Sequence, residues 1–183
     1  MPLKAFVKVG SITNLSDARY CAGMSVDMLG FRTIEGQENY IKPSLFQEIR
    51  GWISGPLVVA EVYGLTHADQ LTTILENYKP DYLEMGVTEL ALFSTLPLPV
   101  ILAVAAGEAK QTFPIVPAYL VSANPFNTSS PLLVKVQSKD ELDSLLANPD
   151  VKGIVLKGGN ELRPGLKEFE LMNDVLEALE FEV

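Results

Sequence analysis

The chain is short of the residues that build metal centres and disulfides. Its 183 residues include one cysteine, Cys21, and one histidine, His67. A single cysteine excludes an internal disulfide and suits a reducing compartment, so we expect a cytoplasmic protein. Zinc and paired-metal sites draw on several thiolate or imidazole ligands, so the sequence predicts no metal site.

Basic residues and long apolar runs are also scarce. The chain has 14 Lys and Arg against 23 Asp and Glu, a net charge of −9. Nucleic-acid phosphates would repel such a chain, so we expect no nucleic-acid partner. No apolar run approaches the roughly 18 residues of a membrane helix, and residues 1–4 lack the pattern of a signal peptide. We therefore expect no membrane partner.

Apolar residues are plentiful, at 48% of the chain. At this length the composition predicts one globular domain, residues 1–183, with a sizeable core. Eight short apolar runs stand out: 3–9, 27–31, 56–62, 81–85, 98–104, 117–122, 131–136 and 151–156. Most are continuous in Val, Ile and Leu, which is typical of parallel strands buried on both faces.

Helix signals separate several of these runs. The expected starts are Asn14 with Asp17 three places on, Pro43, Thr66 with Asp69, and Ser138 with Glu141. Gly23 is expected to end the first helix in a left-handed conformation, and Trp52 to pack inward with Leu45 and Ile49. Eight strands with interleaved helices predict an α/β fold, a (β/α)8 TIM barrel. A doubly wound open sheet is the alternative, because periodicity does not report closure.

The fifth and sixth connections are poor in helix formers. Residues 105–116 contain Gly107 and Pro114, and residues 123–130 read ANPFNTSS, a turn composition. We therefore predict that helices five and six are short or missing. The bare barrel wall would then be covered by a second copy, giving a homodimer, or filled within one chain by Phe113 or Phe126.

The first βαβ unit carries a resemblance to a known family. Residues 8–15 read KVGSITNL and are followed by Asp17-Ala18, Ala22-Gly23 and Leu29-Gly30-Phe31; later come Tyr40–Pro43, Gly158-Gly159 and Pro164–Lys167. This pattern resembles phosphoribosylanthranilate isomerase of tryptophan biosynthesis, which opens K-I-C-G-I-T-N and continues D-A, A-G and G-F at the same intervals. The resemblance favours the barrel over the open sheet.

That resemblance implies an Amadori rearrangement of a phosphorylated sugar, needing a general acid and a general base but no cofactor. The family uses a cysteine after strand one as base and an aspartate ending strand six as acid. The matching positions here are Gly10 and Ser122. The family's arginine after strand two matches Asn39, and its strand-eight aspartate matches Ile154. The usual acid and base are therefore replaced.

Other residues are candidates for the site. Glu61 and Glu84 lie in neighbouring strands, where they form an acid–base pair or bond Lys8, Arg32 or Lys135. Lys8 is a substrate ligand or half of a buried ion pair, and Arg32 is an anion binder or a solvated rim residue.

A phosphate subsite is expected near the last two strands. The resemblance implies backbone N–H groups there, at Ser138, Gly158 and Gly159, although capping alone also explains Ser138.

Three functions stay open at this point. The chain is a non-catalytic or repurposed sugar-phosphate-binding relative of the isomerase, which we favour. It is otherwise an isomerase working through substitute carboxylates such as Glu84, or a scaffold that uses the bare wall between strands five and seven.

Overall fold

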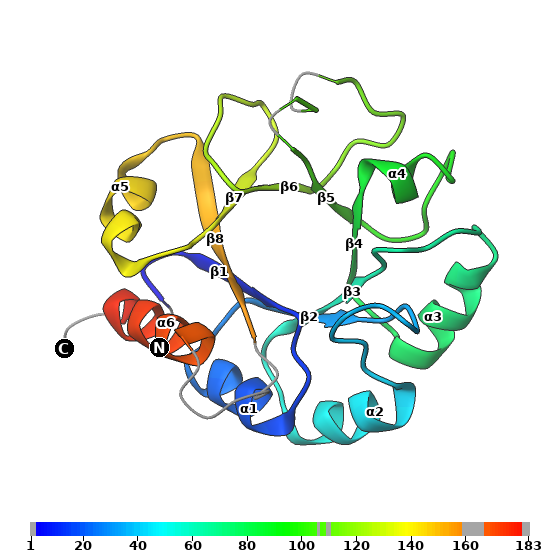
Figure 1. Cartoon of the computed structure of the whole chain (residues 1–183), viewed down its shortest axis with the longest axis horizontal. Helices are drawn as coiled ribbons and strands as arrows, with labels where there is room; N and C mark the ends of the chain where they lie inside the picture. The colour runs from blue at the N-terminus through cyan, green and yellow to red at the C-terminus, as the bar shows by residue number, and fades with distance from the viewer. Residues whose placement is uncertain (1–2, 106, 109–110, 159–166, 181–183) are drawn as a thin grey trace.

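Eight parallel strands close into a barrel. The computed structural model describes residues 3–105, 107–108, 111–158 and 167–180. The strands pair in chain order and β8 returns to β1, so the predicted TIM barrel is confirmed and the open sheet is excluded (Figure 1). The strands are β1 (Phe6–Gly10), β2 (Met28–Arg32), β3 (Leu57–Glu61), β4 (Tyr82–Gly86), β5 (Val100–Ala103), β6 (Tyr119–Ser122), β7 (Leu132–Lys135) and β8 (Val151–Lys157).

The helices lie outside the ring of strands and cover it unevenly (Figure 1). They are α1 (Leu15–Gly23), α2 (Pro43–Trp52), α3 (Gln70–Tyr78), α4 (Val87–Leu90), α5 (Leu142–Ala147, after a 3-10 turn over Lys139–Glu141) and α6 (Lys167–Leu179). In the described residues no helix joins β5 to β6 or β6 to β7, as predicted. The single turn of α4 was not anticipated.

Loops of the same chain cover the wall that lacks helices. Phe113, Ile115 and Phe126 are partly buried and pack against the core cluster beside these strands, where Figure 1 shows only loops. The strand residues beneath are buried; Leu102 has no exposure and Leu120 has 5%. The gap is thus filled within one chain, the second predicted alternative, and the homodimer stays a prediction.

The barrel has an apolar lower half and a charged upper half. Alternate residues of each strand face the interior, where Met28, Val59, Ile101, Val121, Leu133 and Val155 form one cluster with Phe6, Tyr82 and Tyr119. The same alternation puts charged residues at the C-terminal ends of the strands. A larger cluster fills the space between the strands and the helices. Ile154 belongs to this outer cluster, so the inward residue of β8 at this level is Val155.

Two aspartates tie the lower ends of neighbouring strands together. Asp27, just before β2, accepts a hydrogen bond from the Val7 N–H of β1 at 2.8 Å. Asp81, just before β4, accepts one from the Val58 N–H of β3 at 2.8 Å. Each carboxylate thereby satisfies a backbone donor at the lower end of the barrel.

The start of α1 is confirmed and its end is corrected. The Asn14 side chain accepts a hydrogen bond from the Asp17 N–H at 2.8 Å, as an N-cap does. Gly23 is still helical, so its predicted left-handed conformation is wrong. The helix runs further, and the left-handed residue is Ser25, with φ 60. The Val26 N–H then reaches the Cys21 carbonyl, which completes a Schellman closure.

Two details of α2 and α3 also differ from expectation. Trp52 is 69% exposed, because Phe46 and Ile49 already fill the contact with the sheet and Trp52 is the last helical residue. The cap predicted from Thr66 to Asp69 is absent, because α3 begins later, at Gln70. The Gln70 side chain instead accepts bonds from the Thr66 and His67 N–H groups at 3.1 Å each.

Candidate functional site

Three charged side chains meet in the upper barrel interior. Lys8 of β1 lies with its Nζ 2.9 Å from Glu61 Oε1 of β3 and 2.5 Å from Glu84 Oε2 of β4. All three side chains are at most 5% exposed. Barrel curvature brings the inward side chain of β1 within reach of those of β3 and β4, the second and third strands from it around the ring, so residues far apart in sequence form one cluster. This is the ion-pair alternative for Lys8, and for the two glutamates it is the alternative in which they bond Lys8.

Glu61 receives further donors from the rim. Arg32 Nε lies 3.0 Å from Glu61 Oε2. The Ser11 N–H is 3.2 Å from both carboxylate oxygens, and Ser11 Oγ donates to Oε2 at 3.4 Å. Glu61 is therefore held by two cations, a backbone donor and a hydroxyl. Lys135 makes no bond to either glutamate within the described part of the chain.

Tyr63 links Glu84 to Arg32. Its hydroxyl donates to Glu84 Oε1 at 2.7 Å. The Arg32 guanidinium carbon lies 4.6 Å from the centre of the Tyr63 ring, in a cation–π contact. The guanidinium is thus fixed by this ring, by its ion pair with Glu61, and by the hydrogen bond that its Nε donates to Ser11 Oγ at 3.3 Å. Glu84 Oε2 has no hydrogen bond of good geometry among the described residues beyond its ion pair with Lys8.

The cluster shifts the pKa values of Lys8, Glu61 and Tyr63 away from neutral pH. Burial alone would lower the pKa of Lys8, but Glu61 and Glu84 outweigh it and raise the pKa above its usual value. Burial alone would raise the pKa of Glu61, but Lys8 and Arg32 outweigh it and lower the pKa. Burial, and then the charge of Glu84, raise the pKa of Tyr63 well above its ordinary value. Lys8 stays charged, Glu61 ionised and Tyr63 neutral.

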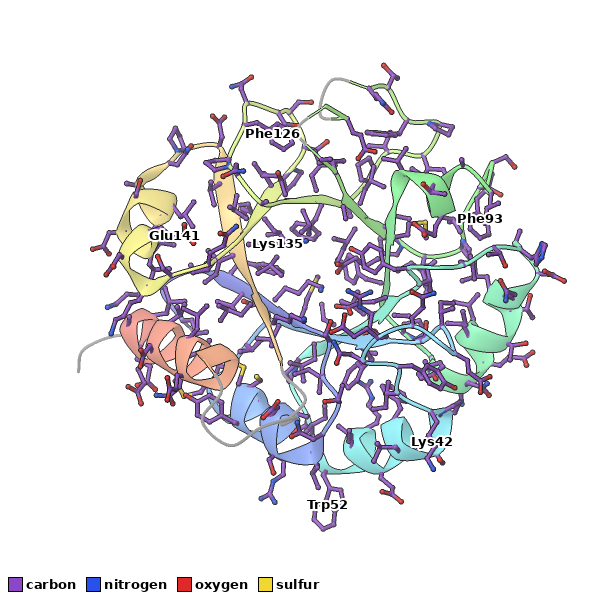
Figure 2. All side chains as sticks on the ribbon, in the orientation of Figure 1. Lys42, Trp52, Phe93, Phe126, Lys135 and Glu141 are labelled. Atoms are coloured by element: carbon purple, nitrogen blue, oxygen red, sulfur yellow. The ribbon has the colours of Figure 1, made fainter. Side chains whose placement is uncertain are left out.

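A cavity of about 340 Å³ opens above this cluster at the C-terminal ends of the strands. Active sites of TIM barrels lie at this end. Its walls include Lys8, Arg32, Glu61, Tyr63 and Glu84 from one side, and Lys135, Gln137 and Lys157 from the other. Figure 2 places Lys135 inside the ring of strands. The cavity has the size of a small-ligand site.

The sequence-predicted residues divide into two groups. Lys8, Arg32, Glu61 and Glu84 come together in this cavity. Ser138 and Gly158 do not line it, and Gly159 lies outside the described residues.

The backbone donors of the expected phosphate subsite have partners within the chain. The Ser138 N–H donates to Glu141 Oε1 at 3.1 Å, and the Gln137 N–H donates to the same oxygen. The Gly158 N–H donates to the Gly10 carbonyl at 2.7 Å. A phosphate would have to displace Glu141 or Gly10 to use them.

Tyr63, Ser11 and Lys157 were missed as site residues, and Lys135 was named only as a possible partner of the two glutamates. Lys135 and Lys157 each stand two places after an inward apolar residue, Leu133 and Val155, so alternation pointed to them. Tyr63 stands two places after Glu61 by the same rule. Ser11 gave no such signal, because its role depends on a turn after β1, where it has φ 54.

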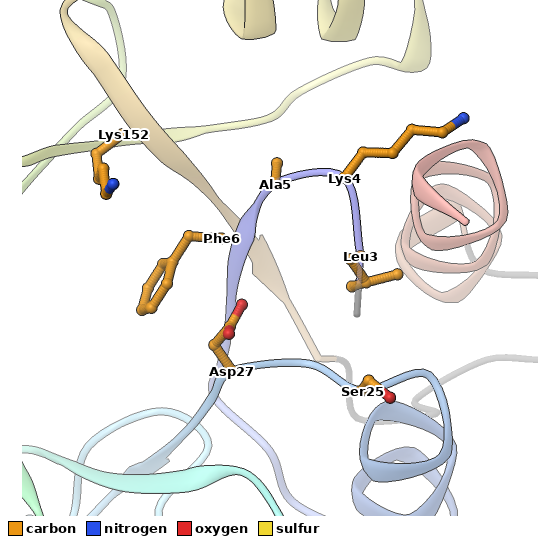
Figure 3. A pocket seen from close by; sticks show the side chains of 7 residues that line it. All are labelled: Leu3, Lys4, Ala5, Phe6, Ser25, Asp27 and Lys152. Atoms are coloured by element: carbon orange, nitrogen blue, oxygen red, sulfur yellow. The ribbon is translucent and has the colours of Figure 1, made fainter. Parts of the chain in front are cut away.

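The opposite end of the barrel has a larger hollow, of about 710 Å³, lined by Leu3, Lys4, Ala5, Phe6, Ser25, Asp27 and Lys152 (Figure 3). Its one carboxylate, Asp27, is already bonded to the Val7 N–H. Residues at the lower face of such barrels serve stability rather than chemistry. We therefore place the candidate site at the upper end.

The described residues contain neither a cluster of metal-ligating side chains nor a candidate membrane span. They contain no group of three His, Cys, Asp or Glu side chains placed to hold a metal ion. Within the same residues, no helix has the length and apolar character needed to cross a membrane.

Comparison with known proteins places the fold. No protein-family model and no curated protein sequence matches the chain. Among solved structures, phosphoribosylanthranilate isomerase from Thermus thermophilus has a TM-score of 0.74 at 18% identity, covering 95% of this chain and 98% of that one. TrpF from Jonesia denitrificans has a TM-score of 0.73 at 15% identity, with 96% of each chain covered.

A third similar structure carries a ligand. It is a phosphoribosylanthranilate isomerase in complex with reduced 1-(o-carboxyphenylamino)-1-deoxyribulose 5-phosphate; its TM-score is 0.69 at 16% identity, over 94% of this chain and 97% of that one. Identities this low establish the fold rather than the activity. The chain thus has the TIM-barrel fold of the phosphoribosylanthranilate isomerases over nearly its whole length.

Proposed function

We propose that this barrel binds a phosphorylated sugar at the C-terminal ends of its strands and does not catalyse the isomerisation of phosphoribosylanthranilate. The observation that carries the proposal is the closed charge cluster. Lys8 and Arg32 are paired with Glu61, and Lys8 also with Glu84. These neighbours keep Lys8 a cation and Glu61 an anion, so neither group is suited to pass protons to and from a sugar.

Binding is supported by the positive charge on the far side of the cavity, where Lys135 and Lys157 line the wall. The similar isomerase whose structure holds a deoxyribulose 5-phosphate derivative suggests the class of ligand. A cavity of about 340 Å³ suits a compound of that class.

Binding and turnover can be measured separately. Isothermal titration with ribulose 5-phosphate is expected to show saturable binding, weakened at least about tenfold by the double substitution Lys135→Gln and Lys157→Gln. The fluorescence of phosphoribosylanthranilate is expected to persist with purified protein, and a tryptophan auxotroph lacking this isomerase is expected not to grow when it expresses the chain.

The alternative function is an isomerase that works through Glu84. One observation favours it: Glu84 lines the cavity and its Oε2 lacks a hydrogen bond of good geometry in the described residues. Saturable turnover that disappears in Glu84→Gln, with the variant still folded by circular dichroism, would establish this alternative and overturn our proposal. The homodimer and the cytoplasmic location remain predictions from the sequence.

A further inference from the structure

Glu61 occupies a complete anion-binding site built from the chain's own donors. We call Lys8, Ser11 and Arg32 the Glu61 cradle. Lys8 Nζ and Arg32 Nε lie 2.9 and 3.0 Å from its two oxygens, and the Ser11 N–H reaches both at 3.2 Å. Two cations with a backbone donor are what a protein commonly offers a bound carboxylate or phosphate. Here the anion is a side chain that is 2% exposed.

Two glycines make room for this carboxylate. A Cβ built on Gly10 would lie 2.5 Å from Glu61 Oε1, and one on Gly30 would lie closer still. Neither glycine has the positive φ that only glycine adopts readily, so the need is for space. A side chain at position 10 would therefore force the Glu61 carboxylate out of its present position. Position 10 is where the resembled family carries its cysteine.

Charge in the cavity is consequently divided into two halves. The deep half holds Lys8 and Arg32 against Glu61 and Glu84, so its formal charge sums to zero. The outer half holds Lys135 and Lys157. Lys157 has a distant partner, Glu38, at 4.0 Å, and that glutamate side chain is 85% exposed, so solvent screens their attraction.

Among the described residues, it is side chains that can hold an anion in the outer half. The nearest backbone donors, the N–H groups of Gln137, Ser138 and Gly158, are bonded within the chain. Two lysine ammonium groups suit one phosphate monoester. A second anion on the same ligand would enter the deep half, where both cations are already paired with Glu61 and Glu84.

We propose that Glu61 acts as a built-in anion in the barrel mouth, so that the cavity accepts ligands with one anionic group, a phosphate held by Lys135 and Lys157, and rejects ligands that also carry a carboxylate. This inference rests on the proposed sugar-phosphate binding and specifies the ligand class. The inner part of such a ligand is uncharged and rich in hydroxyl groups, which can bond Ser11, Tyr63 and Glu84.

A matched pair of ligands tests the selectivity. Reduced 1-(phenylamino)-1-deoxyribulose 5-phosphate and its o-carboxyphenylamino counterpart differ only in a carboxylate. Titration calorimetry of the wild type is expected to show the carboxylate-free compound binding roughly 100-fold more tightly, because the added carboxylate would lose its water in the deep half, where Glu61 and Glu84 already pair with both cations. Glu61→Gln is expected to reduce the ratio below about tenfold. Glu48→Gln, which makes the same charge change on an exposed residue of α2, should leave the ratio unchanged.

The outcomes separate this inference from the proposed function. Equal binding of the two compounds, or tighter binding of the carboxylated one, would overturn the inference and leave sugar-phosphate binding intact. Binding of neither compound would overturn both.

A second experiment addresses the cradle without any sugar phosphate. Glu61→Ala empties the cradle, and sodium formate can then fill it. The melting temperature of this variant is expected to rise with formate and level off, with ionic strength held constant by sodium chloride. The wild type and Glu48→Ala should not respond. Absence of a formate effect in folded Glu61→Ala would overturn the claim that Lys8, Ser11 and Arg32 form an anion-binding site. If that variant does not fold, the inference is tested by the affinity ratio of the two compounds in Glu61→Gln alone.

Discussion

Lys8 Nζ donates to Glu61 Oε1 across 2.9 Å, between strands separated by 53 residues of sequence and with both side chains buried. This pair spans β2, the strand that pairs with both β1 and β3, and Glu84 of β4 adds a second carboxylate at 2.5 Å from the same nitrogen. Neither carboxylate has another lysine partner among the described residues. Lys8 is therefore the one cation that both glutamates share within the part of the chain that the structure describes.

Lys8→Met is expected to lower the free energy of unfolding by about 3–5 kcal/mol, because it leaves buried carboxylates without their cation. Urea denaturation followed by circular dichroism measures this loss. Lys152→Met, at an exposed position of β8, should change stability by no more than about 0.5 kcal/mol. A loss as small for Lys8→Met as for Lys152→Met would mean that the cluster does not support the fold.

Stability is expected to fall at both extremes of pH, for opposite reasons. The pKa of Glu61 is lower in the folded chain, so its contribution is present above the unfolded pKa of about 4.3 and is lost as pH falls through the folded pKa. The pKa of Lys8 is higher in the folded chain, so its contribution is present below about 10.4 and is lost as pH rises through the folded pKa. Between these two pH ranges, the contributions of Glu61 and Lys8 to the free energy of unfolding should stay constant.

Glu61→Gln tests the acid limb of that profile. The stability difference between wild type and variant should be largest near neutral pH and should shrink as pH falls below about 4, when the wild-type carboxylate is protonated. Urea midpoints at a series of pH values report it. A gap that stays constant down to pH ~2 would assign the acid limb to other carboxylates.

Gly30→Ala is expected to destabilise the barrel by about 1–3 kcal/mol, because the added methyl group would overlap the Glu61 carboxylate. Gly51→Ala is the matched control. Gly51 lies in α2, and a Cβ added there would meet nothing within 4 Å, so alanine should be neutral or stabilise the helix by up to about 1 kcal/mol. Combining Gly30→Ala with Glu61→Ala should recover part of the loss. Equal effects of Gly30→Ala in the presence and absence of the Glu61 carboxylate would contradict the steric explanation.

Cys21 is expected to be inert in the folded protein. Burial, and then the nearby charge of Asp17, raise the pKa of the thiol to about 12, and the side chain packs against Met172 of α6 with sulfur atoms 3.7 Å apart. Because the thiolate is the reactive form, labelling by Ellman's reagent at pH ~8 should require unfolding. Labelling rates across a urea series should follow the unfolded fraction. Rapid labelling without urea would show that α1 and α6 separate locally.

Much of the fold was predictable because its signals are local. Continuous apolar runs marked the strands, Asn14 and Ser138 marked helix starts, and the turn composition of residues 123–130 marked a connection without a helix. Trp52 shows that local signals do not always predict burial correctly. Helical spacing placed it on the inner side, but Phe46 and Ile49 had already filled that contact.

The sequence by itself determined the eight strands, the positions of most helices and the placing of Glu61 and Glu84 on neighbouring strands. Only the closed barrel decided that Lys8 meets both glutamates, that Arg32 lies on Tyr63, and that Gly10 and Gly30 are bare because a carboxylate fills their space. The physical reason is that local pattern reports which face a residue takes. It does not report which residues from distant strands share the enclosed space.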